Sequence, residues 1–119
     1  MAKIGDDRMI VGGQRRPDGS WLFTICYTAY FADDDLGLQF DDAVRISGLH
    51  RSDRVAVAVE CPVPFRASGH RVFRKKRIVV RGDDDDFGVG RDPVCAWIRL
   101  HRRTGPAIED EQRTPPLAP

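Results

Sequence analysis

Apolar side chains alternate with polar ones along most of the chain, and the clearest stretch runs from Trp21 to Phe31. Every second residue there is aromatic, aliphatic or alanine, and threonine or cysteine occupies positions 24, 26 and 28. A period of two with aromatic and β-branched residues is typical of a half-buried strand. The segment 8–16 before it carries Met9, Ile10 and Val11, and Pro17-Asp18-Gly19 between the two segments favours a tight turn. The pattern predicts a β-hairpin whose Gly12-Gly13 pair indicates a bulge or a close backbone approach.

Four further segments have the pattern of short strands: 43–47, 54–60, 71–81 and 94–100. Segment 54–60 is apolar on both faces, which predicts a central strand. No window of ten or more residues has a convincing helical period, and 33–42 is the only short helical candidate. Six to seven short strands predict an all-β, single-domain antiparallel β-sandwich of immunoglobulin-like, C2-like or transthyretin-like kind. A partly open barrel is the alternative.

Residues 104–119 have a different composition from the rest of the chain. Four prolines stand among them, together with the acidic run Glu109 to Glu111. Such a segment is typical of a disordered tail or one draped on the surface. We therefore expect a sandwich domain over 1–103 and a Pro-rich disordered tail over 104–119.

Charge and length narrow the class of protein. A length of 119 residues suits one domain. The chain has 19 Lys plus Arg and 18 Asp plus Glu, so its net charge is +1. It therefore lacks the global basic field that drives non-specific nucleic-acid binding. Sixteen arginines, 15 aspartates and no asparagine favour the hypothesis of a GC-rich source genome, and we expect a bacterial protein. No apolar run spans a bilayer, and Met1 to Asp7 lacks a secretory pattern. The three cysteines are widely spaced, so we expect free thiols and a cytoplasmic protein without membrane contact.

Two Asp-rich segments, 33–42 and 83–92, raise a calcium-binding hypothesis. Calcium takes six to eight oxygen ligands from flexible loops, and two acidic loops at one end of a sandwich can supply them. The ligands under this hypothesis are Asp33, Asp35, Asp84, Asp86 and Asp92. No EF-hand spacing is present, and aspartate also serves turns and solubility. Calcium is the one cofactor that the sequence suggests.

Segment 71–81 holds six cations in eleven residues around Phe73. Such a run can meet phosphates while the ring stacks on a base, which makes weak nucleic-acid binding an alternative function. Strand alternation divides the cations between two faces, and four aspartates follow at 83–86. We therefore expect a charged edge or solvent-facing strand whose cations pair with loop aspartates, and no nucleic-acid partner.

No catalytic motif is present: there is no metal-binding histidine spacing, no nucleophile elbow and no phosphate or dinucleotide loop. We expect a non-enzymatic module that binds another protein or associates with itself as a homo-oligomer. Phe40, Phe65 and Phe87 are predicted between strands, where aromatic side chains can anchor a partner. The alternative is that these rings fill the ends of the sandwich.

Overall fold

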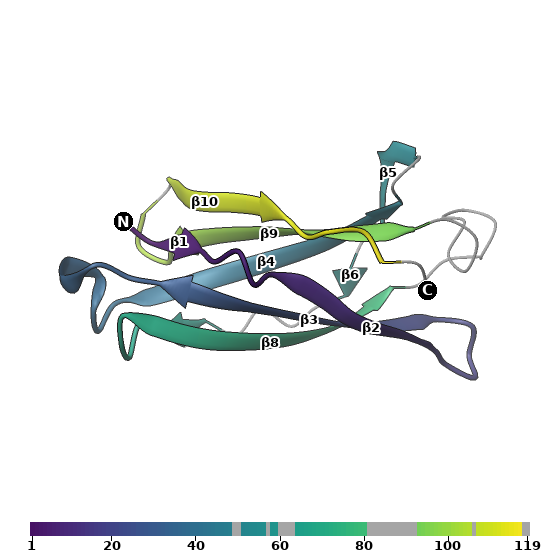
Figure 1. Cartoon of the computed structure of the whole chain (residues 1–119), viewed down its shortest axis with the longest axis horizontal. Helices are drawn as coiled ribbons and strands as arrows, with labels where there is room; N and C mark the ends of the chain where they lie inside the picture. Colours follow the sequence, from purple (N-terminus) through teal and green to yellow (C-terminus); the bar gives the residue numbers. More distant parts are fainter. Residues whose placement is uncertain (49–50, 57, 60–63, 81–92, 106, 118–119) are drawn as a thin grey trace.

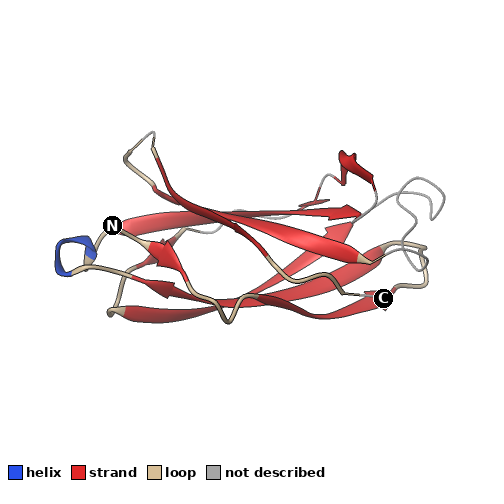
Figure 2. Ribbon diagram, turned by 45° about the horizontal axis from the view of Figure 1, so that its top comes forward, coloured by secondary structure: helices blue, strands red, loops and turns tan. Residues whose placement is uncertain are grey.

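Two antiparallel sheets face each other in an elongated molecule with principal extents of 46 × 23 × 23 Å (Figures 1 and 2). The computed structural model describes residues 1–48, 51–56, 58–59, 64–80, 93–105 and 107–117. The first sheet contains β1 (Lys3–Ile4), β2 (Met9–Arg15), β3 (Trp21–Tyr30), β6 (Ala58–Val59) and β8 (Arg71–Val80). The second contains β4 (Gln39–Gly48), β5 (Arg51–Ala56), β7 (Phe65–Arg66), β9 (Val94–Arg102) and β10 (Ile108–Arg113). The predicted β-sandwich is confirmed, with more strands than the six to seven expected.

The predicted N-terminal hairpin is confirmed as β2 and β3. Gly19 has φ = 87°, the left-handed conformation that the turn requires and that glycine adopts without steric strain. The register shifts between Ile10 and Gly12, which is the predicted bulge. Opposite Phe23, a Cβ on Gly13 would lie 2.7 Å from the phenyl ring, so glycine is needed for the close approach.

The longest strand pairs form the centre of each sheet. In the first sheet, β3 pairs with β8 from Trp21 opposite Val80 to Tyr30 opposite Arg71. In the second, β4 pairs with β9 from Phe40 opposite Arg102 to Gly48 opposite Val94. The alternating apolar residues of these strands fill the space between the sheets, and residues 23, 25, 27 and 29 of β3 are fully buried. The core therefore follows directly from the alternation seen in the sequence.

The segment predicted as a central strand, 54–60, is divided between the two sheets. β5 pairs with β4 in the second sheet, and β6 pairs with β8 in the first. Among the strands that the structure describes, each lies at the end of its sheet's order, which contradicts the prediction of a central strand. Apolar residues on both faces show that a segment suits burial, but they do not specify which strands it pairs with.

Within the segment predicted as a disordered tail, 104–119, residues Ile108–Arg113 form β10, so the prediction is wrong for these residues. β10 pairs with β9, and Thr114 continues the pairing through hydrogen bonds with Ala96 in both directions, at 2.8 and 2.9 Å. Beyond it, Val94 and Leu117 form a bridge. Sequence periodicity missed β10 because its side chains are mostly polar and only half-buried. Its order comes from backbone pairing with β9, which a side-chain pattern does not report.

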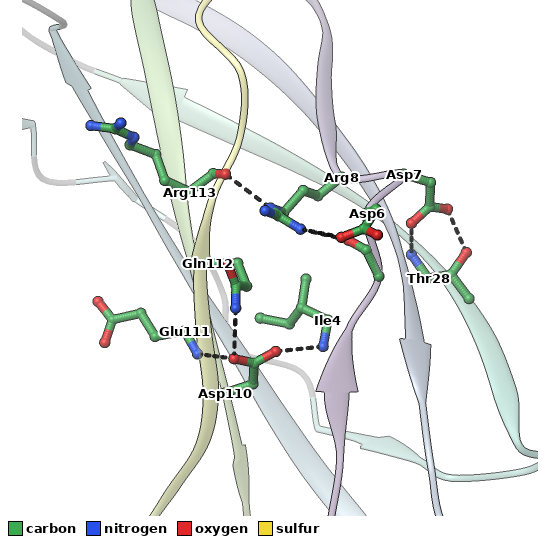
Figure 3. Close-up of polar contacts among 10 residues, drawn as sticks. Ile4, Asp6, Asp7, Arg8, Thr28, Asp110, Glu111, Gln112 and Arg113 are labelled. Carbon is green, nitrogen blue, oxygen red and sulfur yellow. Dashed lines mark hydrogen bonds and ion pairs between the residues drawn. The ribbon is translucent and has the colours of Figure 1, made fainter.

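The N-terminal segment ties the two sheets together along one side (Figure 3). β1 pairs with β3 in the first sheet, and the N–H of Ile4 donates to Asp110 of β10 in the second, at 2.8 Å. The Arg8 Nε donates to the carbonyl oxygen of Arg113 at 2.9 Å. These contacts close this side of the sandwich.

Among the described residues, no helix has the length and apolar character that a membrane crossing requires.

Candidate interaction surface

The two described aspartates of the calcium hypothesis have separate partners. The buried Asp35 carboxylate lies 3.1 Å from the amine of Met1 and 3.1 Å from a guanidinium nitrogen of Arg102. Burial opposes its ionisation, but a backbone N–H and these two cations outweigh that effect and lower the pKa of Asp35. Asp33 is exposed, and its Oδ1 lies 2.5 Å from Nε2 of His70. Among the residues that the structure describes, no three possible metal ligands come together.

The other ligands of that hypothesis, Asp84, Asp86 and Asp92, lie outside the described residues. The strand before them is described, and its last residue, Val80, pairs with Trp21 at the start of β3. Asp33 and Asp35 instead follow the far end of β3, and a ten-residue strand is about 34 Å long. The register therefore gives no support to one calcium site shared by both acidic segments.

Phe40 and Phe65 are core residues, so the prediction that they anchor a partner is wrong. They pair across β4 and β7, and their exposed fractions are 0% and 9%. Together with Phe31 they form a cluster with ring centroids 4.7 to 6.4 Å apart. The alternative use of these rings, filling one end of the sandwich, is the one observed. Phe87, the third predicted anchor, lies outside the described residues.

The alternation of β8 separates its cations into an inward and an outward set. On the inward side, the Lys76 Nζ lies 2.8 Å from Oδ1 of Asp42 and also donates to the carbonyl oxygen of that residue. The Arg74 Nε donates to the other carboxylate oxygen at 2.9 Å, and the Tyr27 hydroxyl does so at 2.7 Å. Asp42 belongs to β4, so these four residues form an inter-sheet cluster. The prediction that these cations pair with loop aspartates is wrong for Arg74 and Lys76, because Asp42 lies in a strand. The prediction of an edge strand is also wrong, since β8 lies between β3 and β6.

Charge and burial set the protonation states of the inter-sheet cluster. Burial opposes ionisation of Asp42, but the hydrogen bond from Arg74 and the charge of Lys76 outweigh it, and its pKa is lowered. Burial and the neighbouring Asp42 charge raise the pKa of Tyr27 far above its usual value. Asp42 is thus ionised and Tyr27 neutral near pH 7. The guanidinium of Arg74 also stacks on Phe65, 4.1 Å from the ring centre. The cluster's groups are engaged with one another in the core, which is a structural role.

On the outward side, β8 presents three cations around one aromatic ring. Arg71, Phe73, Lys75 and Arg77 are all exposed, and Phe73 is 65% exposed. Side chains on one face of a strand are about 6.8 Å apart, so the ring stands between neighbouring cations. Within the described part of the chain, none of the three cations forms an ion pair.

Neighbouring strands extend this strip. Tyr30 of β3 lies opposite Arg71 and is 43% exposed. Cys26 of β3 lies opposite Lys75 on one side and Met9 of β2 on the other, and Met9 is 50% exposed. The resulting surface, here called the basic–aromatic face, comprises Met9, Tyr30, Arg71, Phe73, Lys75 and Arg77. Spacing by two within 71–77 was visible in the sequence, but Tyr30 and Met9 join the surface only through cross-strand pairing.

An exposed aromatic ring among exposed cations is suited to recognition of an acidic, partly apolar surface. Comparison of the chain with protein-family models, with curated proteins and with solved structures finds no match, so the geometry of this face is the basis for assigning a function.

Proposed function

We propose that this protein is a non-enzymatic binding module that recognises an acidic surface of another protein through its basic–aromatic face. The observation that carries the proposal is the 65% exposure of Phe73 on a strand where its neighbours on the same face are all cations. Aromatic anchors within a polar rim are typical of binding hot spots. The free thiols of Cys26 and Cys95 suit a reducing compartment, so we place this activity in the cytoplasm.

Charge favours a different protein over a second copy as the partner. A two-fold dimer through this face would bring the three cations of one copy against the same three of the other. Like charges in contact oppose association, whereas carboxylates on a partner would pair with them. An acidic protein surface is therefore the better complement, and an oligomer built through this face is the less favoured alternative.

Nucleic acid is a weaker complement to the same face. Three cations that meet three phosphates predict a log–log salt slope of about −2.7 on duplex DNA, which is a weak electrostatic footprint. The two inward cations of β8 do not add to it, because Asp42 holds them in the core.

The test combines affinity capture with direct binding. Wild-type protein, Phe73→Ala, Lys75→Glu and the control Arg66→Glu are immobilised and exposed to a lysate of the source organism. Arg66 is an exposed cation of β7 in the other sheet, so its reversal changes net charge but not the basic–aromatic face. Captured proteins are then purified and titrated. We expect an acidic protein that binds wild type and the control, with affinity lowered about thirtyfold by Phe73→Ala, as for a hot-spot residue.

Three outcomes contradict the proposal. The first is a purified partner that binds Phe73→Ala and Lys75→Glu as tightly as wild type. The second is the absence of any direct binder among the captured proteins. The third is submicromolar binding of an oligonucleotide at about 200 mM salt that Lys75→Glu abolishes, which would assign the face to nucleic acid.

A further inference from the structure

The outer face of the second sheet, opposite to the basic–aromatic face, carries a small hollow beside Trp97. It has a volume of about 110 Å³ and is lined by Ala43, Val44, Arg45, Trp97, Arg99 and Glu111. Three neighbouring strands, β4, β9 and β10, supply these residues. The hollow shares no residue with the basic–aromatic face or the inter-sheet cluster.

Cross-strand register explains why a hollow forms at this place. Arg45 lies opposite Trp97, and Ala43 lies opposite Arg99 in the next pair on the same face. The single methyl group of Ala43 thus stands among long side chains and leaves space above it. On the other side of β9, Arg99 pairs with Glu111, and Figure 3 shows the Glu111 side chain extending to the side of β10 away from β1. The hollow is therefore built by the register of three strands.

Two guanidinium groups converge on one carboxylate at the edge of this hollow. An Arg45 nitrogen donates to Oε1 of Glu111 at 3.2 Å, and the Arg99 Nε lies 3.5 Å from Oε2. Arg45 also lies 5.6 Å from the centre of the Trp97 ring, as does Arg113 from β10. Two arginines thus lie near the indole ring, and Arg99 and Glu111 line the same hollow. The site keeps a positive balance even with Glu111 ionised, and the arginine side chains on Glu111 are 43% and 44% exposed.

We infer that the hollow beside Trp97 binds a small carboxylate, held by Arg45 and Arg99 with its carbon chain against Trp97 and Ala43. Guanidinium groups are well matched to carboxylates, and an indole wall favours an apolar chain over bare inorganic anions. A volume of about 110 Å³ suits a group with a few carbon atoms. In the free protein, Glu111 occupies the guanidinium groups as an internal competitor of the ligand.

Propionate and glutarate are the free carboxylic acids used as probes. A short capped peptide with one glutamate presents the same carboxylate group on a protein side chain. Binding is followed by calorimetry and by the indole N–H signals of the two tryptophans in ¹H–¹⁵N spectra. We expect the Trp97 signal to shift while the Trp21 signal stays, with Kd on the order of 1 mM for an exposed site of this size. Free acids and peptide are compared directly, so the preferred source follows from their relative affinities.

Three variants separate this site from a structural cluster. Ala43→Leu fills the hollow without changing charge, and we expect it to abolish binding. Glu111→Gln removes the competing carboxylate, and we expect binding of propionate to tighten about fivefold. Arg66→Ala, which removes one cation from a distant exposed position of the same sheet, is the matched charge control and leaves affinity unchanged. Circular dichroism and thermal unfolding check that each variant is folded.

Several results would overturn the inference. Weaker propionate binding in Glu111→Gln would show that Glu111 is a direct ligand, and binding of tetramethylammonium that Glu111→Gln abolishes would assign the hollow to cations. Unchanged affinity in folded Ala43→Leu would place the ligand elsewhere. Absence of a Trp97 shift in wild type at about 20 mM propionate, roughly twenty times the expected Kd, would exclude the site.

Discussion

Lys76 of β8 and Asp42 of β4 form an ion pair across the core, with 2.8 Å between the Lys76 Nζ and the Asp42 Oδ1. Their side chains are 6% and 1% exposed, so the pair is shielded from water on both sides. The two residues belong to different sheets, and Arg74 and Tyr27 share the same carboxylate. The position of one sheet over the other is thereby tied to a single acidic group in the core.

The first prediction concerns the loss of that acidic group. Asp42→Asn leaves Arg74 and Lys76 in the core without their carboxylate, which should lower the free energy of unfolding by about 3–5 kcal/mol. Lys76→Met removes one cation, keeps the apolar stem and leaves the Asp42–Arg74 pair complete, so it should be the milder change. Urea unfolding of both variants measures the difference. A Lys76→Met protein less stable than Asp42→Asn would contradict this account.

The second prediction follows from the lowered pKa values of Asp42 and Asp35. The native state then binds fewer protons than the unfolded state in acid, so stability is fully present above the unfolded-state pKa of about 3.9 and declines as pH falls through the folded-state values. Unfolding free energy measured from about pH 6 to pH 2.5 should fall most steeply below about pH 4. Asp42→Asn should flatten this decline. Asp34→Asn, at an exposed position, serves as the control and should retain the wild-type profile.

The third prediction contrasts two phenylalanines. Phe40 is fully buried against Phe31 and Phe65, so Phe40→Ala should lower the free energy of unfolding by about 3–5 kcal/mol. Phe73→Ala removes a ring that is 65% exposed and should change stability by less than about 1 kcal/mol. Thermal and urea unfolding of the two variants compare them directly. Similar losses in both would mean that Phe73 contributes to the core and is unsuited to a partner surface.

The fourth prediction concerns the C-terminal strand. A chain that ends at Gly105 lacks β10 and the contacts of Thr114 with Ala96, and its melting temperature should fall by about 10 °C or more. Thr114→Val keeps β10 but leaves the buried N–H of Ala96 without its side-chain acceptor, at a cost of about 1–3 kcal/mol. Differential scanning calorimetry measures both. A truncated chain with wild-type stability would contradict this account and show that β10 does not stabilise the fold.

The fifth prediction addresses calcium. Asp35 is paired with the amine of Met1 and the guanidinium of Arg102. The register also places Val80, the last residue of β8, far from the 3-10 helix η1 (Asp33–Asp35). We therefore expect no thermal stabilisation in millimolar Ca²⁺. A bound ion at one hundred times Kd would stabilise the fold by about 2.7 kcal/mol, which thermal unfolding detects easily. A clear rise in melting temperature, lost in Asp33→Asn or Asp84→Asn, would revive the calcium hypothesis.

Local features of this protein were accessible from the sequence because they depend on neighbouring residues. The alternation of Trp21 to Phe31 gives β3 its buried face, and Gly19 provides the turn before it, since both follow from backbone sterics within a few residues. The division of the 71–81 cations between two faces is equally local. The sequence alone therefore predicted an antiparallel β fold, with a sandwich favoured over a partly open barrel, together with its first hairpin and the division of the cations near Phe73 between two faces.

Contacts between distant residues were decided by the tertiary structure. Asp42 meets Lys76 because two sheets stack, and Phe40 meets Phe65 because β7 joins β4, neither of which follows from a side-chain period. β10 is ordered by backbone pairing with β9 although its side chains are mostly polar. The hollow beside Trp97 likewise depends on the register of three strands. Pairing and register are set by the packing of the whole chain, since the same alternation permits many neighbours and only the common core selects among them.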